Sequence, residues 1–375
     1  MSTSRTKRAA IQARDVEVPQ SRTETRPIRP ADTTTPAFLG LIPGAASQPV
    51  LVRAVDELDA LIGLRVEQNP MRTFLPDAVY SFFANGGAQC YVVACPSMDS
   101  TAVLSGLTGL EREPSVSMVA IPDLWRAADP KSVITAVAEH CARLRTRVTI
   151  VDLPPDIAPG SALSTLPALS PIQRQFLTVF HPWLRITGTG GERMTPPCGL
   201  IMGALARNDK DWGPGRAPTV LAVDDFPLAV GLVDDGEKFR QEEIINILRA
   251  QGARKAIVEN ARTLSSDSDF RHLNVSRLVC FLVDSIQQSM DWVAFEPNTE
   301  QLWSTLRASV QTFLSNLWSA GALRGSTPED AFYVTCDATN NTPSGEAITI
   351  DIGVAPTVPA EFVLFTIKET RLGAR

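Results

Sequence analysis

The chain has 375 residues, of which 44% are hydrophobic and 20% are charged. This length and composition are typical of a globular protein with one large domain or two ordinary ones. The net charge of −6 argues against a nucleic-acid-binding protein unless the basic groups cluster. No apolar run has the length of a membrane span, and no apolar stretch of a secretory signal follows the basic N-terminus. The six cysteines are therefore expected to be reduced thiols of a cytosolic protein.

Residues 1–35 are rich in Arg, Thr and Pro and poor in large apolar side chains, so they cannot form a core of their own. Two interpretations stay open. The segment is disordered in the free chain, because burial does not offset the entropy of ordering it, or it is an arm that orders on a neighbouring molecule. In both cases we expect an N-terminal extended arm over 1–35.

The segment after this arm predicts alternating strands and helices. Strands are expected at 37–42, 50–52 and 90–94, and helices at 56–62 and 77–83.

A βαβ unit is predicted next. Strands are expected at 116–121 and 148–152, and the helix between them begins at Asp129–Pro130, because proline fits the first turn. The apolar residues of this helix recur three and four apart and form one face: Val133, Val137, Cys141 and Leu144. Two strands joined by such a helix indicate a mainly parallel sheet, to which 176–180 and 184–186 would add.

A second block of elements begins near residue 236, after a turn-rich stretch with one helix at 200–207. Its helices are expected at 242–250, 275–288 and 298–320, the last capped by Asn298 with Gln301 in the reciprocal position. Its strands are expected at 256–258, 292–295, 331–336, 348–354 and 361–368. The last strand is apolar on both faces, so it should be sandwiched or lie near an interface.

These patterns together predict a mixed α/β (α+β) fold with two domains. We expect an N-terminal α/β domain over 36–235, a C-terminal α/β domain over 236–360 and a C-terminal strand or arm over 361–375.

No group of residues forms a convincing catalytic or metal site. The three histidines lack a nucleophile elbow, Cys90 and Cys95 flank an apolar strand, and the glycines at 188–191 fit neither a phosphate loop nor a dinucleotide turn. The best enzymatic candidate is Asp152, which with Asp156 brackets a Pro-Pro turn at the end of a predicted parallel strand. One mixed-charge group is either a solvated surface or an intersubunit ion-pair network: Asp267, Asp269, Arg271 and Arg277.

Several segments resemble the tail sheath proteins of contractile phages and phage-like injection systems. In the N-terminal part they are 37–40, 82–83, 85–87 and 90–93, and further along they are 261–264, 274–275 and Arg277. The most specific series keeps its order near the C-terminus: Phe295-Glu-Pro-Asn298, Leu302-Trp303, Phe313-Leu314, Leu317-Trp318, Gly321-Ala-Leu323, Gly325, Thr327-Pro-Glu329, Ala331-Phe332, Cys336-Asp337, Thr339-Asn-Asn-Thr342, Ile352-Gly-Val-Ala-Pro356 and Pro359-Ala-Glu-Phe362. The resemblance covers most of residues 36–370.

The N-terminal arm departs from this family in one respect. Members often carry a Pro-Gly-Val-Tyr motif there, whereas this chain reads Asp15-Val-Glu-Val-Pro19, followed by the more familiar Arg26-Pro-Ile28. The chain also leaves little space for outer decorating domains, which favours a compact, extracellular-type injection system over a large phage tail.

The resemblance implies a structural subunit that forms stacked six-subunit rings around an inner tube and contracts to drive the tube into a target. It implies no enzymatic activity and no cofactor or metal. The implied partners are further copies of this chain, the tube protein, and baseplate and tail cap proteins, with neither nucleic acid nor membrane insertion. Assembly is expected in the bacterial cytoplasm. The alternatives are a cap or baseplate-joining protein with the same fold, or an α/β enzyme that uses Asp152.

The resemblance also implies which residues meet other subunits. Terminal arms would add strands to the sheet of a neighbour, and their candidate residues are Arg26, Pro27, Ile28, Phe362, Val363, Leu364, Phe365, Thr366 and Ile367. The helix at 298–320 would help to face the tube through Glu300, Arg307 and Gln311.

Overall fold

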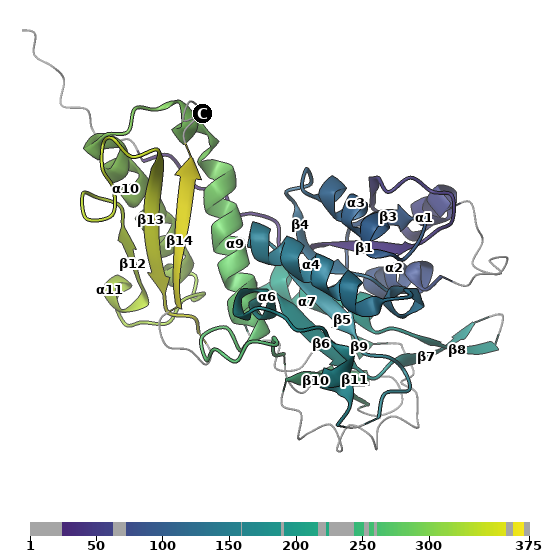
Figure 1. Cartoon of the computed structure of the whole chain (residues 1–375). Helices are drawn as coiled ribbons and strands as arrows, with labels where there is room; N and C mark the ends of the chain where they lie inside the picture. Colours follow the sequence, from purple (N-terminus) through teal and green to yellow (C-terminus); the bar gives the residue numbers. More distant parts are fainter. Residues whose placement is uncertain are drawn as a thin grey trace, which may run out of the picture.

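The computed structural model describes residues 25–62, 73–158, 160–188, 191–216, 223–224, 244–250, 255–258, 261–357 and 363–370. Within these residues a larger N-terminal lobe and a smaller C-terminal lobe lie on either side of the long helix α9 (Leu273–Ser289) (Figure 1). Both lobes combine helices with sheets, so the predicted mixed α/β class is confirmed.

A nine-stranded sheet forms the centre of the N-terminal lobe. Its spatial order is β2 (Pro49–Val52), β3 (Cys90–Cys95), β1 (Thr35–Leu41), β4 (Val116–Ala120), β5 (Val148–Asp152), β6 (Leu177–His181), β10 (Ile245–Ala250), β11 (Lys255–Val258) and β9 (Val223–Asp224). The pairs from β3 to β10 are parallel, whereas β2, β11 and β9 add antiparallel at the two edges. The strand expected at 184–186 lies outside this sheet, because it pairs as β7 (Leu184–Gly188) with β8 (Gly191–Thr195).

Helices join and cover these strands. They are α1 (Val55–Ile62), α2 (Leu75–Ala84), α3 (Ser100–Leu110), the 3₁₀ helix η2 (Leu124–Arg126), α4 (Pro130–Leu144), α5 (Ala162–Thr165), α6 (Pro171–Gln175) and α7 (Cys198–Trp212). Helix α7 packs closely on α2 because it carries glycine at the contact. A Cβ atom on Gly199 would lie 1.9 Å from the carbonyl oxygen of Ala78.

The C-terminal lobe is a three-stranded antiparallel sheet backed by helices. The strands are β12 (Phe332–Thr335), β13 (Ala347–Val354) and β14 (Val363–Thr370), with β13 in the middle. The helices are α9, the 3₁₀ helix η4 (Asp291–Phe295), α10 (Glu300–Ser319) and α11 (Pro328–Ala331).

Each lobe has its own hydrophobic core, and α9 contributes residues to both cores. Leu273 and Cys280 of α9 belong to the first core, which surrounds the nine-stranded sheet. Leu282 belongs to the second core, together with Trp303 of α10 and Ile350 of β13. A helix with apolar residues on both of these sides is a fixed connection rather than a flexible linker.

The helix predicted at 242–250 was wrong, because this segment is strand β10. Ile245 and Ile247 are buried, and between them the Asn246 amide donates hydrogen bonds to the Thr178 hydroxyl at 2.8 Å and to the Val179 carbonyl at 3.0 Å. Strand β10 lies between β6 and β11 in the nine-stranded sheet, which explains why its side chains are buried. The change of core therefore lies near Leu273, well beyond the domain boundary expected at 235/236.

Two expectations around residue 295 were also wrong. The strand expected at 292–295 is the 3₁₀ helix η4, and the N-cap of α10 is Thr299, whose hydroxyl accepts from the Leu302 N–H. Asn298 is buried instead, where its side-chain oxygen accepts from the Trp303 indole N–H at 2.6 Å. An asparagine that supports a buried tryptophan is unavailable for capping.

Candidate functional site

Asp152, the best enzymatic candidate in the sequence, is buried at the end of β5. Asp152 is 5% exposed, and its carboxylate faces the N–H and thiol of Cys198 at the first turn of α7. Burial raises the pKa of Asp152 to about 7. Asp156 is exposed, and burial together with the charge of Arg147 lowers the pKa of His140 to about 3. Among the described residues, no three His, Cys, Asp or Glu side chains gather as a metal site.

The sheet of the C-terminal lobe has an unpaired edge on β14. Val363, Phe365 and Ile367 point into the second core, while Leu364 and Thr366 point outward. The predicted apolar character on both faces is thus limited to Leu364, which is 59% exposed. Among the described residues, strand β14 pairs with β13 only, so every second backbone N–H and C=O along its other side points away from the sheet.

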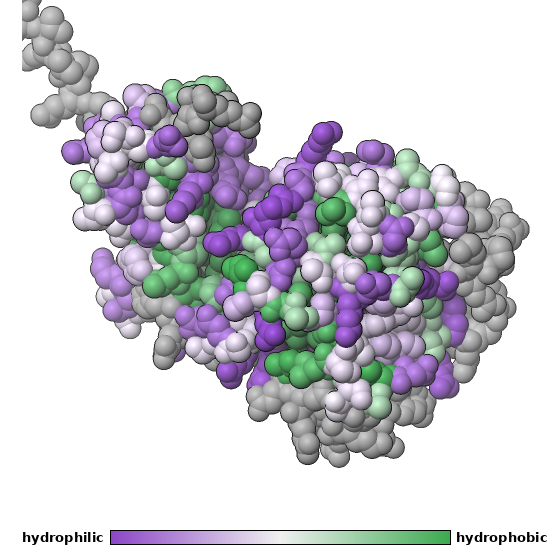
Figure 2. Space-filling model, viewed as in Figure 1, coloured by the Kyte–Doolittle hydropathy of each residue, from purple (hydrophilic) through white to green (hydrophobic). Residues whose placement is uncertain are grey.

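A groove lies between the two lobes, over the outward face of this sheet, and we call it the interlobe groove. Its volume is about 640 Å³, and it is lined by β12, β13 and β14, by α9 through Val279 and Val283, and by the ends of α4 and α6 through Arg145 and Phe176. Figure 2 shows apolar side chains on the C-terminal lobe where it faces the N-terminal lobe. The outward face of the sheet therefore borders a partly apolar groove.

Residues 25–34, which we call the N-terminal linker, run along the C-terminal lobe before the chain enters β1. Three of its backbone N–H groups donate to serine hydroxyls of α9 and α10, at 3.0, 3.0 and 2.9 Å: Arg26 to Ser309, Arg29 to Ser289 and Ala31 to Ser285. Bonds to the main chain fix the path of the linker with little demand on its side chains.

Two of the predicted arm residues add side-chain contacts to this path. The Arg26 guanidinium lies 3.9 Å from the centre of the Trp292 ring and 3.5 Å from the Glu296 carboxylate. Ile28 packs against the second core. Arg26, Pro27 and Ile28 thus lie on their own C-terminal lobe, while Phe362 is outside the described residues.

A buried ion pair joins both lobes to the linker. Arg277 of α9 and Asp209 of α7 form two parallel hydrogen bonds of 2.8 and 2.6 Å, and their side chains are 4% and 0% exposed. The same guanidinium donates to the Thr33 carbonyl at 2.9 Å. Arg277 therefore does not belong to the exposed charge group with Asp267 that its sequence position suggested.

The three residues proposed to face a tube differ in their surroundings. Glu300 and Gln311 are exposed on α10, one in the first turn and one near the middle. Arg307 lies 3.3 Å from Asp337, at the start of the loop between β12 and β13. These residues lie on one helix but do not form a single polar cluster.

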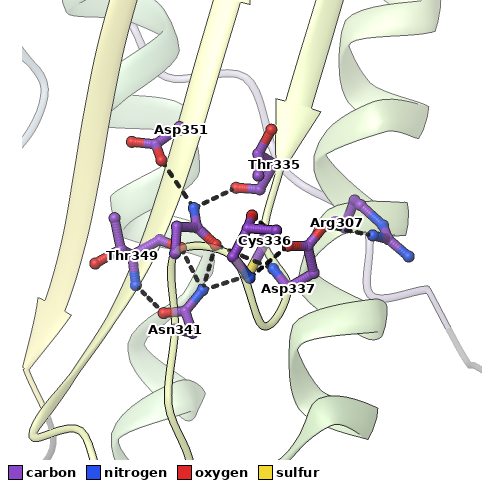
Figure 3. A network of polar contacts seen from close by, with 9 residues as sticks. Arg307, Thr335, Cys336, Asp337, Asn341, Thr349 and Asp351 are labelled. Carbon is purple, nitrogen blue, oxygen red and sulfur yellow. Dashed lines mark hydrogen bonds and ion pairs between the residues drawn. The ribbon is translucent and has the colours of Figure 1, made fainter.

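A polar network holds that loop in place (Figure 3). The Asn341 side chain accepts from the Thr349 N–H at 2.6 Å and donates to the Thr349 carbonyl at 2.9 Å, so it continues the edge of β13 as a strand would. Asn340 donates to the Asp351 carboxylate at 2.8 Å. The series Thr339-Asn-Asn-Thr342, singled out in the sequence, thus shapes a loop rather than a binding site.

The comparisons with known proteins agree with this arrangement. Residues 265–370 match the family model of the phage tail sheath C-terminal domain, which spans all of α9 and everything to the end of β14. The PVC sheath of an extracellular contractile injection system, in its contracted state, shares the fold with a TM-score of 0.71 and 22% identity over 97% of this chain and 98% of that one. The chain thus carries a phage tail sheath C-terminal domain at 265–370 and shares the fold of contractile sheath proteins along most of its length.

Further sheath structures share the fold at lower or equal identity. The contracted helical sheath of the anti-feeding prophage has a TM-score of 0.70 and 22% identity, over 95% of this chain and 98% of that one. The sheath tail protein from Listeria innocua has a TM-score of 0.61 and 12% identity, over 92% and 96%. No curated protein sequence matched the chain. The sheath fold therefore extends over both lobes, not only over the matched C-terminal domain.

Sequence reasoning missed most of the residues that tie the sheath fold together. The serines that receive the linker and the Asp209 partner of Arg277 have no local signal, because each contact joins residues far apart in the chain. The one local sign of the ion pair was Arg277 itself, a basic residue inside an otherwise apolar helix, since such a residue is rarely buried without a partner. Within the described residues, no helix is long and apolar enough to cross a membrane.

Proposed function

We propose that this protein is the structural subunit of a contractile sheath, which assembles as stacked hexameric rings around an inner tube and shortens to drive the tube into a target. The observation that carries the proposal is the sheath C-terminal domain at 265–370, whose sheet ends in β14, a strand with no partner among the described residues along its outer edge. An unpaired strand edge suits a protein that joins copies of itself by adding strands.

The termini supply the strands that link copies in this proposal. The linker is held on α9 and α10 and its Arg26 lies beside η4, and a fully extended arm of 24 residues before it would span about 80 Å. Residues 363–367 pair with their own β13 in the single chain and exchange onto the β13 of a neighbour on assembly. Links made by main-chain hydrogen bonds keep subunits connected while the lobes change their neighbours.

Contraction then proceeds as a rigid-body rearrangement of subunits. The lobes of one subunit stay together, since α9 belongs to both cores and the Arg277–Asp209 pair is buried between them. The free energy is stored in the extended lattice and released when subunits repack, a transition between two packed arrangements. No nucleotide hydrolysis by this chain is required.

The partners follow from this role. Glu300 and Gln311 of α10 are the proposed contacts to the tube, and Arg307 contributes once it is released from Asp337. Baseplate and cap proteins would bound the sheath at its two ends. Assembly takes place in the bacterial cytoplasm, as part of a phage tail or an injection particle.

A second candidate is a minor sheath protein of the baseplate. The anti-feeding prophage baseplate contains a chain with the same fold, at a TM-score of 0.71 and 22% identity. The number of copies per particle separates the two roles, because a sheath subunit recurs in every ring along the tube and a baseplate subunit lies at one end.

Electron microscopy of the purified chain, with and without its tube protein, tests the proposal. Hollow striated cylinders are expected when the tube is present. Small uniform particles under both conditions would contradict a sheath.

A further inference from the structure

The most exposed large apolar side chain among the described residues is that of Phe295, in the 3₁₀ helix η4. Phe295 is 80% exposed, whereas Trp292 of the same helix is partly buried and lies beneath the Arg26 guanidinium. A single exposed ring is common on globular proteins and is no binding site by itself. Its surroundings therefore have to show what covers it.

Strand β14 ends close to this ring. Thr370 of β14 pairs with Ala347 of β13. Two residues before Ala347, the Gly345 carbonyl accepts a hydrogen bond at 3.0 Å from the side-chain amide of Asn298, which follows Phe295 by three residues. Figure 1 shows the arrowhead of β14 beside the end of α9, from which the chain continues into η4. The chain therefore leaves β14 near the exposed ring.

Two carboxylates lie between the end of β14 and η4. Glu369 of β14 is half-buried and lies near Asp291, in the first turn of η4. Burial and the negative charge of Asp291 raise the pKa of Glu369 to about 7, and no cation among the described residues offsets this rise. A cation placed beside this pair would be stabilised by both carboxylates.

The segment after β14 has the matching composition. Residues 371–375 read Arg-Leu-Gly-Ala-Arg and combine a cation with apolar side chains. Arg371 follows Glu369 by two positions, so a continued strand presents both on the same face. Gly373 permits a turn after the strand, and five residues span up to about 17 Å. This order and length suit a short segment that turns back over η4.

We propose that residues 371–375 form a latch over η4 of the same chain. Leu372 covers Phe295, and Arg371 lies beside the two carboxylates. The latch goes beyond the proposed function, because it stabilises the single chain by holding the end of β14 in place. One consequence alone rests on the proposed function: where β14 exchanges onto a neighbour, the latch opposes that exchange before assembly.

Disulfide cross-linking within the full chain tests the latch. The variant carries Pro297→Cys beside the ring and Ala374→Cys, and the six native cysteines are all buried. Under oxidising conditions the monomer should form an intrachain disulfide, which makes it migrate faster on a gel until a reducing agent is added. The matched control combines Ala374→Cys with Leu104→Cys, an exposed residue of α3 in the other lobe, and should give about tenfold less of this species.

Two results would overturn the latch. One is a yield of intrachain disulfide equal to that of the Leu104→Cys control, and the other is a disulfide that forms only between two chains. Microscopy of the same variant separates the latch from the proposed function. Cylinders without the intrachain disulfide leave the sheath role standing and remove the latch, whereas the disulfide without cylinders keeps the latch and removes the sheath role.

Substitutions in the cross-linking variant test the apolar and the charged contact separately. Phe295→Ser should lower the yield of intrachain disulfide about tenfold, because it removes the ring that Leu372 covers. Arg371→Glu should lower the yield by about the same factor, and Asp291→Lys in the same chain should restore it. A general effect on folding does not produce such restoration. Loss in both charge variants without restoration would contradict the charge pairing.

Hydrogen exchange measures whether the latch holds β14. A chain that ends at Thr370 should exchange the backbone amides of 363–370 about tenfold faster than the full chain, while the amides of α10 keep their rates. Equal rates for 363–370 in the two chains would show that the segment does not hold the strand.

Discussion

The buried ion pair between the lobes allows a quantitative prediction. The variant Arg277→Ala removes both hydrogen bonds to Asp209 and the bond to the Thr33 carbonyl, and leaves the Asp209 carboxylate without a counter-ion at 0% exposure. An unpaired buried charge costs about 3–5 kcal/mol. We expect Arg277→Ala to lower the free energy of unfolding by this amount in urea denaturation followed by tryptophan fluorescence.

Two further variants serve as controls for the stability loss in Arg277→Ala. Arg307→Ala breaks a pair whose side chains are 37% and 40% exposed, and should cost no more than about 1 kcal/mol. Arg277→Met combined with Asp209→Leu removes both charges and should recover most of the stability lost by Arg277→Ala. A loss below about 1 kcal/mol in Arg277→Ala, equal to the Arg307→Ala control, would refute the role of this pair in joining the lobes.

Three further predictions follow from the structure. Trp303→Ala empties the centre of the second core and should destabilise the chain by about 3–5 kcal/mol in the same assay; a loss under 1 kcal/mol would contradict its place there. The pKa of Asp152 is raised from 3.8 to about 7 in the folded state, so its contribution to stability is present below about pH 4 and is lost as the pH rises to 7. Asp152→Asn should flatten this fall in denaturation curves across that range, and an unchanged slope would show that Asp152 does not cause it. Deleting residues 1–24 should prevent sheath assembly and leave the unfolding midpoint unchanged, whereas deleting 1–34 should also lower the midpoint, since it removes the linker; normal cylinders from the shorter deletion would contradict the arm.

The spacing of apolar residues was sufficient to predict the helices and strands whose buried positions recur regularly. The βαβ unit at 116–152 and the long helices α9 and α10 were predicted from the sequence because their helices carry apolar residues three and four positions apart. It failed for β10, where the buried Asn246 lies among polar partners supplied by residues far away in the chain. It also failed for η4, since a five-residue apolar segment fits a strand and a 3₁₀ turn equally well.

The candidate site could be predicted only in outline. The ordered motifs near the C-terminus identified a sheath-like domain, and the family match at 265–370 confirms that resemblance. Arg277 and its partner Asp209 are 68 positions apart in the chain. The linker residue Ala31 and its partner Ser285 are 254 positions apart. No local sequence pattern can indicate contacts over such separations. The interlobe groove likewise exists only once both lobes are placed, because α4, α9 and β14 each supply one of its sides.

The most direct test of the sheath role is electron microscopy of the purified full chain mixed with its tube protein. The account predicts hollow, striated cylinders of sixfold symmetry around the tube, in which this chain recurs in every ring. Only small, uniform particles in the presence of the tube would contradict the account.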